Sequence, residues 1–175
     1  MELGKLAHKL IFRKKFAKVD KPRDFIGFGK AETIGIIYNA TLEENIQLVQ
    51  QFATWLHNSG KKVETLGYIN LKKSEDILDK HKDLDFILKS DVNWYHKPKT
   101  FASSRFIKNK YDILINIYIE ECLPLQYMSA FSDAKFRVGH YQENNLHCND
   151  FLIDLKEKGN VTELIEQIKS YLNKI

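Results

Sequence analysis

The segment DILINIYI at residues 112–119 decides the fold class, because it is the most continuously apolar strand pattern in the chain. Only Asn116 interrupts the run of apolar side chains after Asp112. A strand that is apolar on both faces is typical of a parallel sheet with helices on both sides. A second pattern of this kind, TIGIIYN at Thr33–Asn39, lies earlier in the chain. We therefore predict an α/β protein.

Further strand patterns alternate with helical ones along the chain. The predicted strands besides these two are residues 62–69, 85–88 and 135–138, with a short edge strand possible at 151–155. Helical spacing of apolar residues follows most of them, at residues 42–56, 74–82, 99–110, 124–131 and 161–172. Such alternation implies right-handed crossovers. The prediction is a three-layer, mostly parallel, Rossmann-like sheet of about five strands with helices on both faces.

Local signals mark several helix ends. Thr41 and Glu44 have the spacing of a capping box, in which each side chain bonds the other residue's backbone N–H. Asn160 stands three residues before Glu163 and is predicted to cap the last helix. Gly60 follows the first long helical pattern, where a left-handed residue often ends a helix.

The chain divides near residue 30. Residues 1–30 are predicted to form a basic amphipathic N-terminal arm with a helix up to about residue 17, and residues 31–175 a single α/β domain. The arm holds nine Lys and Arg residues against three acidic ones. Of the chain totals of 27 and 23, this leaves 18 basic and 20 acidic residues in the domain. All excess positive charge therefore lies in the arm.

This charge asymmetry predicts a polyanionic partner. The residues expected to contact it are Lys5, Lys9, Arg13, Lys14, Lys15 and Lys18. RNA or the ribosome is the favoured partner, and an anionic membrane surface ranks below it. A compatible alternative is a terminal helix that docks on the domain through Leu3, Leu6 and Leu10.

A second candidate site lies where the predicted strands end, because ligands of open α/β sheets bind beyond the carboxyl ends of the strands. The polar residues singled out there are Asn39, Thr41, Asp91, Glu120 and His140. Acid–base chemistry or ligand binding is conceivable with this set. The alternative is that polar residues simply populate loops.

The sequence does not support most of the enzyme classes that use this type of fold, because their motifs are missing. Gly27 and Gly29 precede the first strand, whereas a dinucleotide fingerprint needs its glycines after it. No GxxxxGK[ST] phosphate loop and no GxSxG elbow occur. Cys122 and Cys148 form no CxxC pair. We predict no cofactor and no metal, lean against an enzyme, and expect a cytoplasmic protein because no apolar signal or membrane-spanning stretch is found.

Residues 93–100 concentrate aromatic and basic side chains in a predicted loop. Aromatic faces stack on bases and lysines neutralise phosphates, so the loop is a candidate nucleic-acid contact. In the more ordinary interpretation, Trp94 covers the core and the lysines are solvated.

Two resemblances accompany these patterns. Residues 5–15, 101–106, 112–119 and 136–139 resemble an uncharacterised family of small α/β proteins of Bacteroidota, which has no assigned activity. Residues 112–141, with AKFRVG at 134–139, are similar to one half-unit of heptosyltransferase-like glycosyltransferases. Those enzymes need two such domains, so the likeness implies a fold and no catalytic residue.

The leading functional prediction is a non-enzymatic binding or adaptor domain that engages an anionic partner through its arm. The first alternative is a small enzyme or ligand-binding protein with a site at the strand ends, and the second is peripheral membrane association.

Overall fold

A computed structural model describes residues 19, 21–143, 145–155 and 159–174. In chain order the elements are β1 (Thr33–Asn39), α2 (Glu43–Asn58), β2 (Lys62–Ile69), α3 (Glu75–Lys80), β3 (Phe86–Leu88), a 3-10 turn η1 (Lys89–Asp91), α4 (Phe101–Lys108), β4 (Ile113–Ile117), α5 (Leu123–Phe131), β5 (Phe136–His140), β6 (Phe151–Ile153) and α6 (Val161–Leu172). The predicted basic helix lies outside the described residues.

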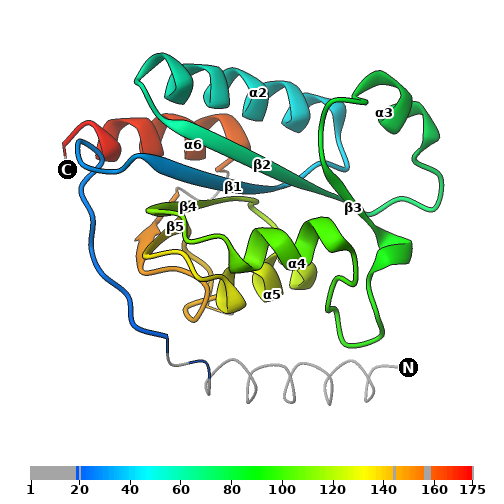
Figure 1. Cartoon of the computed structure of the whole chain (residues 1–175). Coiled ribbons are helices and arrows are strands. Elements are labelled where there is room, and N and C mark those ends of the chain that lie inside the picture. Colours follow the sequence, from blue (N-terminus) through cyan, green and yellow to red (C-terminus); the bar gives the residue numbers. More distant parts are fainter. Residues whose placement is uncertain (1–18, 20, 144, 156–158, 175) are drawn as a thin grey trace.

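One parallel sheet forms the middle layer (Figure 1). Its six strands are ordered β3-β2-β1-β4-β5-β6. Helices α2 and α6 cover one face, and α4 and α5 cover the other. This arrangement confirms the predicted three-layer α/β fold, and the possible edge strand is present as β6.

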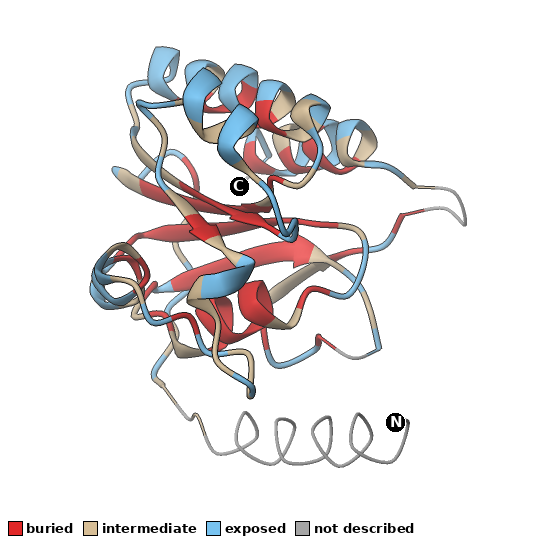
Figure 2. Ribbon diagram, turned by 90° about the vertical axis from the view of Figure 1, so that its right-hand side faces the viewer, coloured by how far each residue is buried: buried red, intermediate tan, exposed pale blue. Residues whose placement is uncertain are grey.

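Strand β4 explains why an apolar run decides the fold. Its register places Ile113 beside Ile34 of β1 and Phe136 of β5, so both of its edges are paired. Side chains alternate between faces. Ile113 and Ile115 join the core under α2 and α6, and Leu114 joins the core under α5. Buried residues accordingly run through the sheet, and exposed ones lie on the outer faces of the helices (Figure 2).

The one polar side chain inside β4 is held by hydrogen bonds. Asn116 donates from Nδ2 to Ser129 Oγ of α5 at 2.8 Å and to the carbonyl of Cys148 at 3.3 Å. Beside it, Arg137 forms two hydrogen bonds to the Asp150 carboxylate, at 3.0 and 2.8 Å. Such partners stabilise buried donors like the Asn116 amide nitrogen, whereas Asn116 Oδ1 is buried and has no hydrogen-bond partner among the described residues. These contacts tie the loop between β5 and β6 to α5.

Residues 21–30 contact the domain closely. Lys21 donates to the carbonyl of Phe131 at the end of α5, and Arg23 donates to the carbonyl of Ser132 at 3.0 Å. Phe28 is buried and stacks on Trp55 of α2. The division near residue 30 stays a prediction, but two of the arm's described cations, Lys21 and Arg23, are occupied by contacts within the chain.

The helix-end predictions have mixed outcomes. Asn160 Oδ1 accepts from Glu163 N at 2.9 Å, which confirms the cap of α6. Gly60 ends α2 with φ of +77°, also as predicted. The capping box is wrong, because α2 begins at Glu43 after Leu42, with no side-chain cap. The Thr41 hydroxyl instead accepts from the backbone N–H of Asn70, at 3.1 Å.

Candidate functional site

The strand order creates a crevice at the centre of the sheet. From β1 the chain moves outward to β2 and β3, and it then returns to place β4 on the other side of β1. The helix after β1 packs on one face and the helix after β4 on the other. The carboxyl ends of β1 and β4 therefore flank an opening, which is where ligands bind in sheets of this kind.

Two cavities lie at this crevice. The first, here called the α5 cavity, measures about 480 Å³ and lies between β2, η1 and the start of α5. The second, the α6 cavity, measures about 600 Å³ and lies between the starts of α2 and α6. Both are lined by Asn39, Asn70 and Glu120, so these residues stand between them. Ligand sites commonly have volumes of roughly 300–1,000 Å³.

Hydrogen bonds fix the shape of the crevice floor. Asn39 Oδ1 accepts from Thr41 N at 3.0 Å, and the Asn39 carbonyl accepts from Asn45 Nδ2 at 3.0 Å. The bond from Asn70 N to Thr41 Oγ1 then connects the end of β2 to the same turn. Tyr68 OH donates to Asn70 Oδ1 at 3.5 Å. The turn after β1 is thus preorganised by side chains from three elements.

The side chains around the two cavities differ in charge. Glu44 and Glu120 bring two carboxylates to the α6 cavity, together with the amide of Asn45. Glu120 and Glu121 bring two carboxylates to the α5 cavity as well, and there Lys89 and His96 line the same cavity. Carboxylate and amide oxygens accept hydrogen bonds from hydroxyl and amino groups. The α6 cavity therefore suits a ligand that carries such donors.

The titratable groups beneath the α5 cavity are neutral. Burial raises the pKa of Cys122 to about 12, so its thiol stays protonated at neutral pH. Burial likewise raises the pKa of Tyr68 to about 12. A reactive cysteine needs a low pKa and access to solvent, and Cys122 has neither. The geometry thus supports binding at this crevice and gives no activated thiol.

A sequence comparison places the chain among known families. The profile of a family described as of unknown function, DUF6913, matches residues 5–175. The chain belongs to this family. A search of curated proteins finds no match. The family match agrees with the resemblance to an uncharacterised family. It assigns no activity to the DUF6913 protein.

The five strand-end residues predicted from the sequence do not all reach the crevice of the DUF6913 protein. Asn39, Thr41 and Glu120 line it. Asp91 lines neither cavity, because its carboxylate accepts from the backbone N–H of Leu88 at 2.8 Å. His140 is at the end of β5 and bonds the carbonyl of Ile153 in β6 through Nδ1, at 3.2 Å. Two strand positions separate it from β1.

Sequence reasoning missed several crevice residues that come from helix starts. Asn45 lies in the first turn of α2, and Asn160 and Thr162 lie at the start of α6. Asn160 carries a local capping signal, which gave no hint that α6 begins beside β1 and β4. The packing of α6 against α2 and β4 brings it there.

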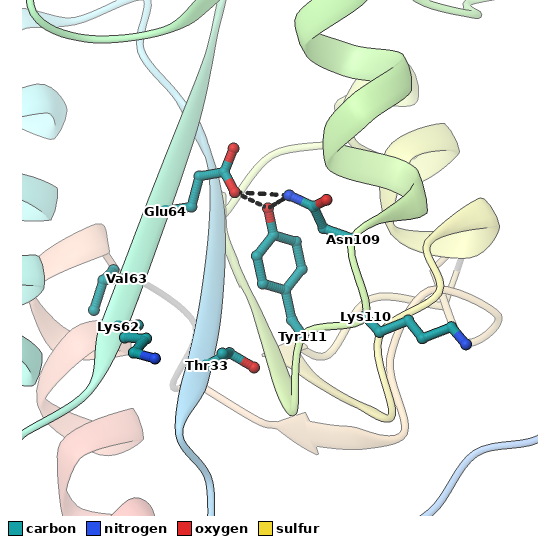
Figure 3. Close-up of a pocket in the computed structure, with 7 residues that line it drawn as sticks. All are labelled: Thr33, Lys62, Val63, Glu64, Asn109, Lys110 and Tyr111. Atoms are coloured by element: carbon teal, nitrogen blue, oxygen red, sulfur yellow. Dashed lines mark hydrogen bonds between the residues drawn. The ribbon is translucent and has the colours of Figure 1, made fainter.

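At the opposite end of the strands, where β1 and β2 begin, a cavity of about 390 Å³ lies beside Glu64, Asn109 and Tyr111 (Figure 3). Glu64 Oε2 accepts from Tyr111 OH at 2.6 Å and from Asn109 Nδ2 at 2.8 Å. Its other oxygen accepts from Arg105 at 2.8 Å. Both carboxylate oxygens are therefore engaged. Burial, and then the bond to Glu64, raises the pKa of Tyr111. We interpret this cluster as a structural connection between α4, β2 and β4.

The remaining predictions concern other regions of the DUF6913 protein. The six basic residues expected to contact an anionic partner lie outside the described residues, so this site stays a prediction. The expectation that Trp94 covers the core is wrong, because 69% of its surface is exposed. Among the helices that the structure describes, none is long and apolar enough to cross a membrane.

Proposed function

We propose that this DUF6913 protein binds a small polar molecule in the crevice between the carboxyl ends of β1 and β4. The observation that carries the proposal is the pair of cavities that share Asn39, Asn70 and Glu120. The polar groups converge at the point where the strand order reverses, which supports a ligand site on physical grounds.

The side chains of the α6 cavity favour a ligand with several hydroxyl or amino groups. Glu120 and Glu44 are the expected hydrogen-bond acceptors, and Asn45 belongs to the same wall. The turn after β1 is already fixed by its own hydrogen bonds, so little ordering entropy is lost on binding.

A thermal-shift screen tests the proposal with nucleosides, sugars and primary amines as probes. A bound ligand at a hundredfold excess over its Kd stabilises the folded state by about 2.7 kcal/mol, which raises the Tm by roughly 5–10 °C. Glu120→Gln should reduce the shift, whereas the exposed Glu75→Gln on α3 should leave it unchanged. The proposal is contradicted if no probe raises the Tm, or if the Glu120→Gln variant shows the same rise in Tm as the unmodified chain.

A second function is favoured by the charge distribution. We propose that the basic arm engages RNA or the ribosome, with an anionic membrane surface as the alternative partner. The support is the excess of six positive charges in residues 1–30 over a domain with an excess of two negative ones. Lys21 and Arg23 are bound to the domain, so the proposal depends on the six basic residues before residue 19.

The arm is tested in the full chain by the triple substitution Arg13→Glu, Lys14→Glu and Lys15→Glu. Phosphate contacts make binding fall steeply with salt, with a slope of about −0.7 per contact for single strands. The variant should bind ribosomal RNA more weakly and with a shallower slope. Unchanged binding to RNA would mean that the arm is not the contact, and flotation with anionic liposomes identifies the membrane alternative.

The likeness to a glycosyltransferase half-unit and the cytoplasmic location remain predictions. Neither contributes a residue to the two proposals.

A further inference from the structure

Helix α5 is apolar on every side, although it lies in an outer layer of the fold. Its sequence, LPLQYMSAF, contains no charged residue, and seven of its nine residues are buried. Leu125 and Met128 belong to the core under the sheet, and Ser129 bonds Asn116 of β4. An outer helix normally turns charged and polar side chains away from the core. The side of α5 that faces away from the sheet therefore needs a cover of its own.

The residues Leu123, Tyr127, Ala130 and Phe131 form this side, here called the α5 outer face. Spacings of four, three and one residues place them on one side of the helix, opposite to the residues that face the sheet. Tyr127 is 8% exposed and Ala130 is 2% exposed. The four residues belong to a cluster separate from the main core, in which the rings of Tyr127 and Phe131 stack with centroids 4.4 Å apart. The α5 outer face is thus apolar and largely withdrawn from solvent.

The described segments around α5 lie beside this face. Helix α4 packs next to α5 in the same layer and contributes Ile107 to the cluster (Figure 1). Cys148 joins it from the loop between β5 and β6. Burial, and then the neighbouring Tyr95, raises the pKa of Tyr127, so the loop before α4 adjoins the face as well. In the part of the chain that the structure describes, no further helix or strand lies outside this layer (Figure 1).

The chain before Lys21 enters the domain next to the α5 outer face. Lys21 Nζ donates to the carbonyl of Phe131 at 2.5 Å, and Arg23 donates to the carbonyl of Ser132 at 3.0 Å. Both carbonyls are at the C-terminal end of α5. The other undescribed residues adjoin α6 or belong to the loop after β5: 144, 156–158 and 175. Residues 1–18 are therefore the candidates for the cover.

The sequence of residues 1–18 contains an apolar pattern of suitable length. Leu3, Leu6 and Leu10, here called the arm stripe, have helical spacing and would extend over roughly 10 Å in a helix, whereas α5 is about 13 Å long. The ten residues between Leu10 and Lys21 can span up to about 33 Å. The arm stripe can therefore reach every part of the α5 outer face.

We propose that the arm stripe docks on the α5 outer face and packs against its apolar cluster. The face has no charged side chain, so it suits an apolar partner and offers nothing to pair with a phosphate. The tether at the end of α5 gives the stripe an effective concentration on the order of millimolar, which favours it over a second copy of the chain. By their spacing Lys5 and Lys9 lie opposite to the arm stripe, so docking leaves them accessible. The proposal is independent of those for the crevice and for RNA.

Hydrogen–deuterium exchange of the full chain, measured by mass spectrometry, tests both the docking and its location. Leu6→Glu with Leu10→Glu brings charge into the arm stripe and changes no residue of the domain. Backbone amides of α5 should then exchange at least about tenfold faster, because a helix without its apolar cover opens more often, whereas exchange in α6 should stay the same. The matched control, Lys5→Glu with Lys9→Glu, brings two glutamates to the opposite side and should leave exchange in α5 unchanged.

Tryptic cleavage of the same variants provides a second measurement. A docked segment resists the protease, so cleavage after Lys9 and Arg13 should be slow in the unmodified chain. The substitutions Leu6→Glu and Leu10→Glu should accelerate this cleavage by about tenfold. Far-ultraviolet circular dichroism of each variant checks that the domain stays folded.

The proposal is overturned if α5 exchanges equally slowly in the unmodified chain and in the variant with Leu6→Glu and Leu10→Glu. It is also overturned if α5 of the unmodified chain exchanges as fast as α3, which has no buried residue, because the face then has no cover. Protection of α5 that increases with protein concentration and ignores the arm variants assigns the face to a second copy of the chain, and this result also overturns the proposal.

Discussion

The carboxylate of Asp112 provides the sharpest test of what holds the central strands together. It precedes β4 and accepts from Glu32 N at 2.8 Å and from Thr33 N at 3.1 Å, at the start of β1. Lys135 Nζ, just before β5, donates to its other oxygen at 2.7 Å. One side chain therefore connects the beginnings of three neighbouring strands. We predict that Asp112→Asn destabilises the fold.

The magnitude follows from the pKa. Burial by itself would raise the pKa of Asp112, but the hydrogen bonds from Lys135, Glu32 and Thr33 outweigh it and lower the pKa from 3.8 to about 2. A lowering of this size corresponds to about 2.5 kcal/mol at neutral pH. The side chain is only 11% exposed, so solvent screens this contribution little. Because folding lowers the pKa, the contribution is complete above about pH 5 and is lost as the pH falls through 2.

Urea unfolding of the two proteins between pH 7 and pH 3 is the assay. The free energy of unfolding of the unmodified chain should exceed that of Asp112→Asn by about 2.5 kcal/mol at pH 7. At pH 3 the difference should be about half as large. The control is Asp79→Asn, at a side chain that is 78% exposed, with an expected change below about 0.5 kcal/mol. A difference between Asp112→Asn and the unmodified chain that stays the same at every pH would refute the reasoning.

Three further substitutions test other parts of the fold. Gly139→Ala places a Cβ 2.5 Å from Asn149 Oδ1 and should cost about 1–3 kcal/mol in the free energy of unfolding, measured in urea. Gly60→Ala should cost about 1 kcal/mol, because φ of +77° at the end of α2 disfavours a side chain, and a lowered Tm would show it. Thr100→Ala removes the cap bond to Ser103 N, 3.1 Å long, and should lower the stability by about 1 kcal/mol, whereas Thr100→Ser should retain it. An unchanged midpoint in any of the three contradicts the corresponding contact.

The sequence predicts the layers well because their signal is local. The alternation of buried strands and amphipathic helices reports the faces that each element buries, and both β1 and β4 show it plainly. Thr41 shows where this reasoning ends. Its hydroxyl has the spacing to cap α2, but it bonds Asn70, from the end of the neighbouring strand. A pattern within four residues cannot show a competing partner that is distant in sequence.

The crevice was predicted only in part for a related reason. Polar residues after a strand are visible in the sequence, whereas the order of the strands is not. Asn39 and Glu120 line the same cavities because β1 and β4 are neighbours, and His140 stays apart because β5 is two strand positions from β1. Trp94 illustrates the converse. Its size predicts burial, yet 69% of its surface is exposed.

The neighbouring position of β1 and β4 also determines how the chain can fold during synthesis. Ile34 pairs with Ile113, so one edge of β1 lacks its partner until β4 leaves the ribosome. At 5–20 residues per second, the delay is roughly 4–16 s. During that time β1, β2 and β3 can assemble with an apolar strand edge open, which is a template for aggregation. Chaperone capture of nascent chains should therefore peak before residue 113 is exposed and decline once β4 closes the sheet.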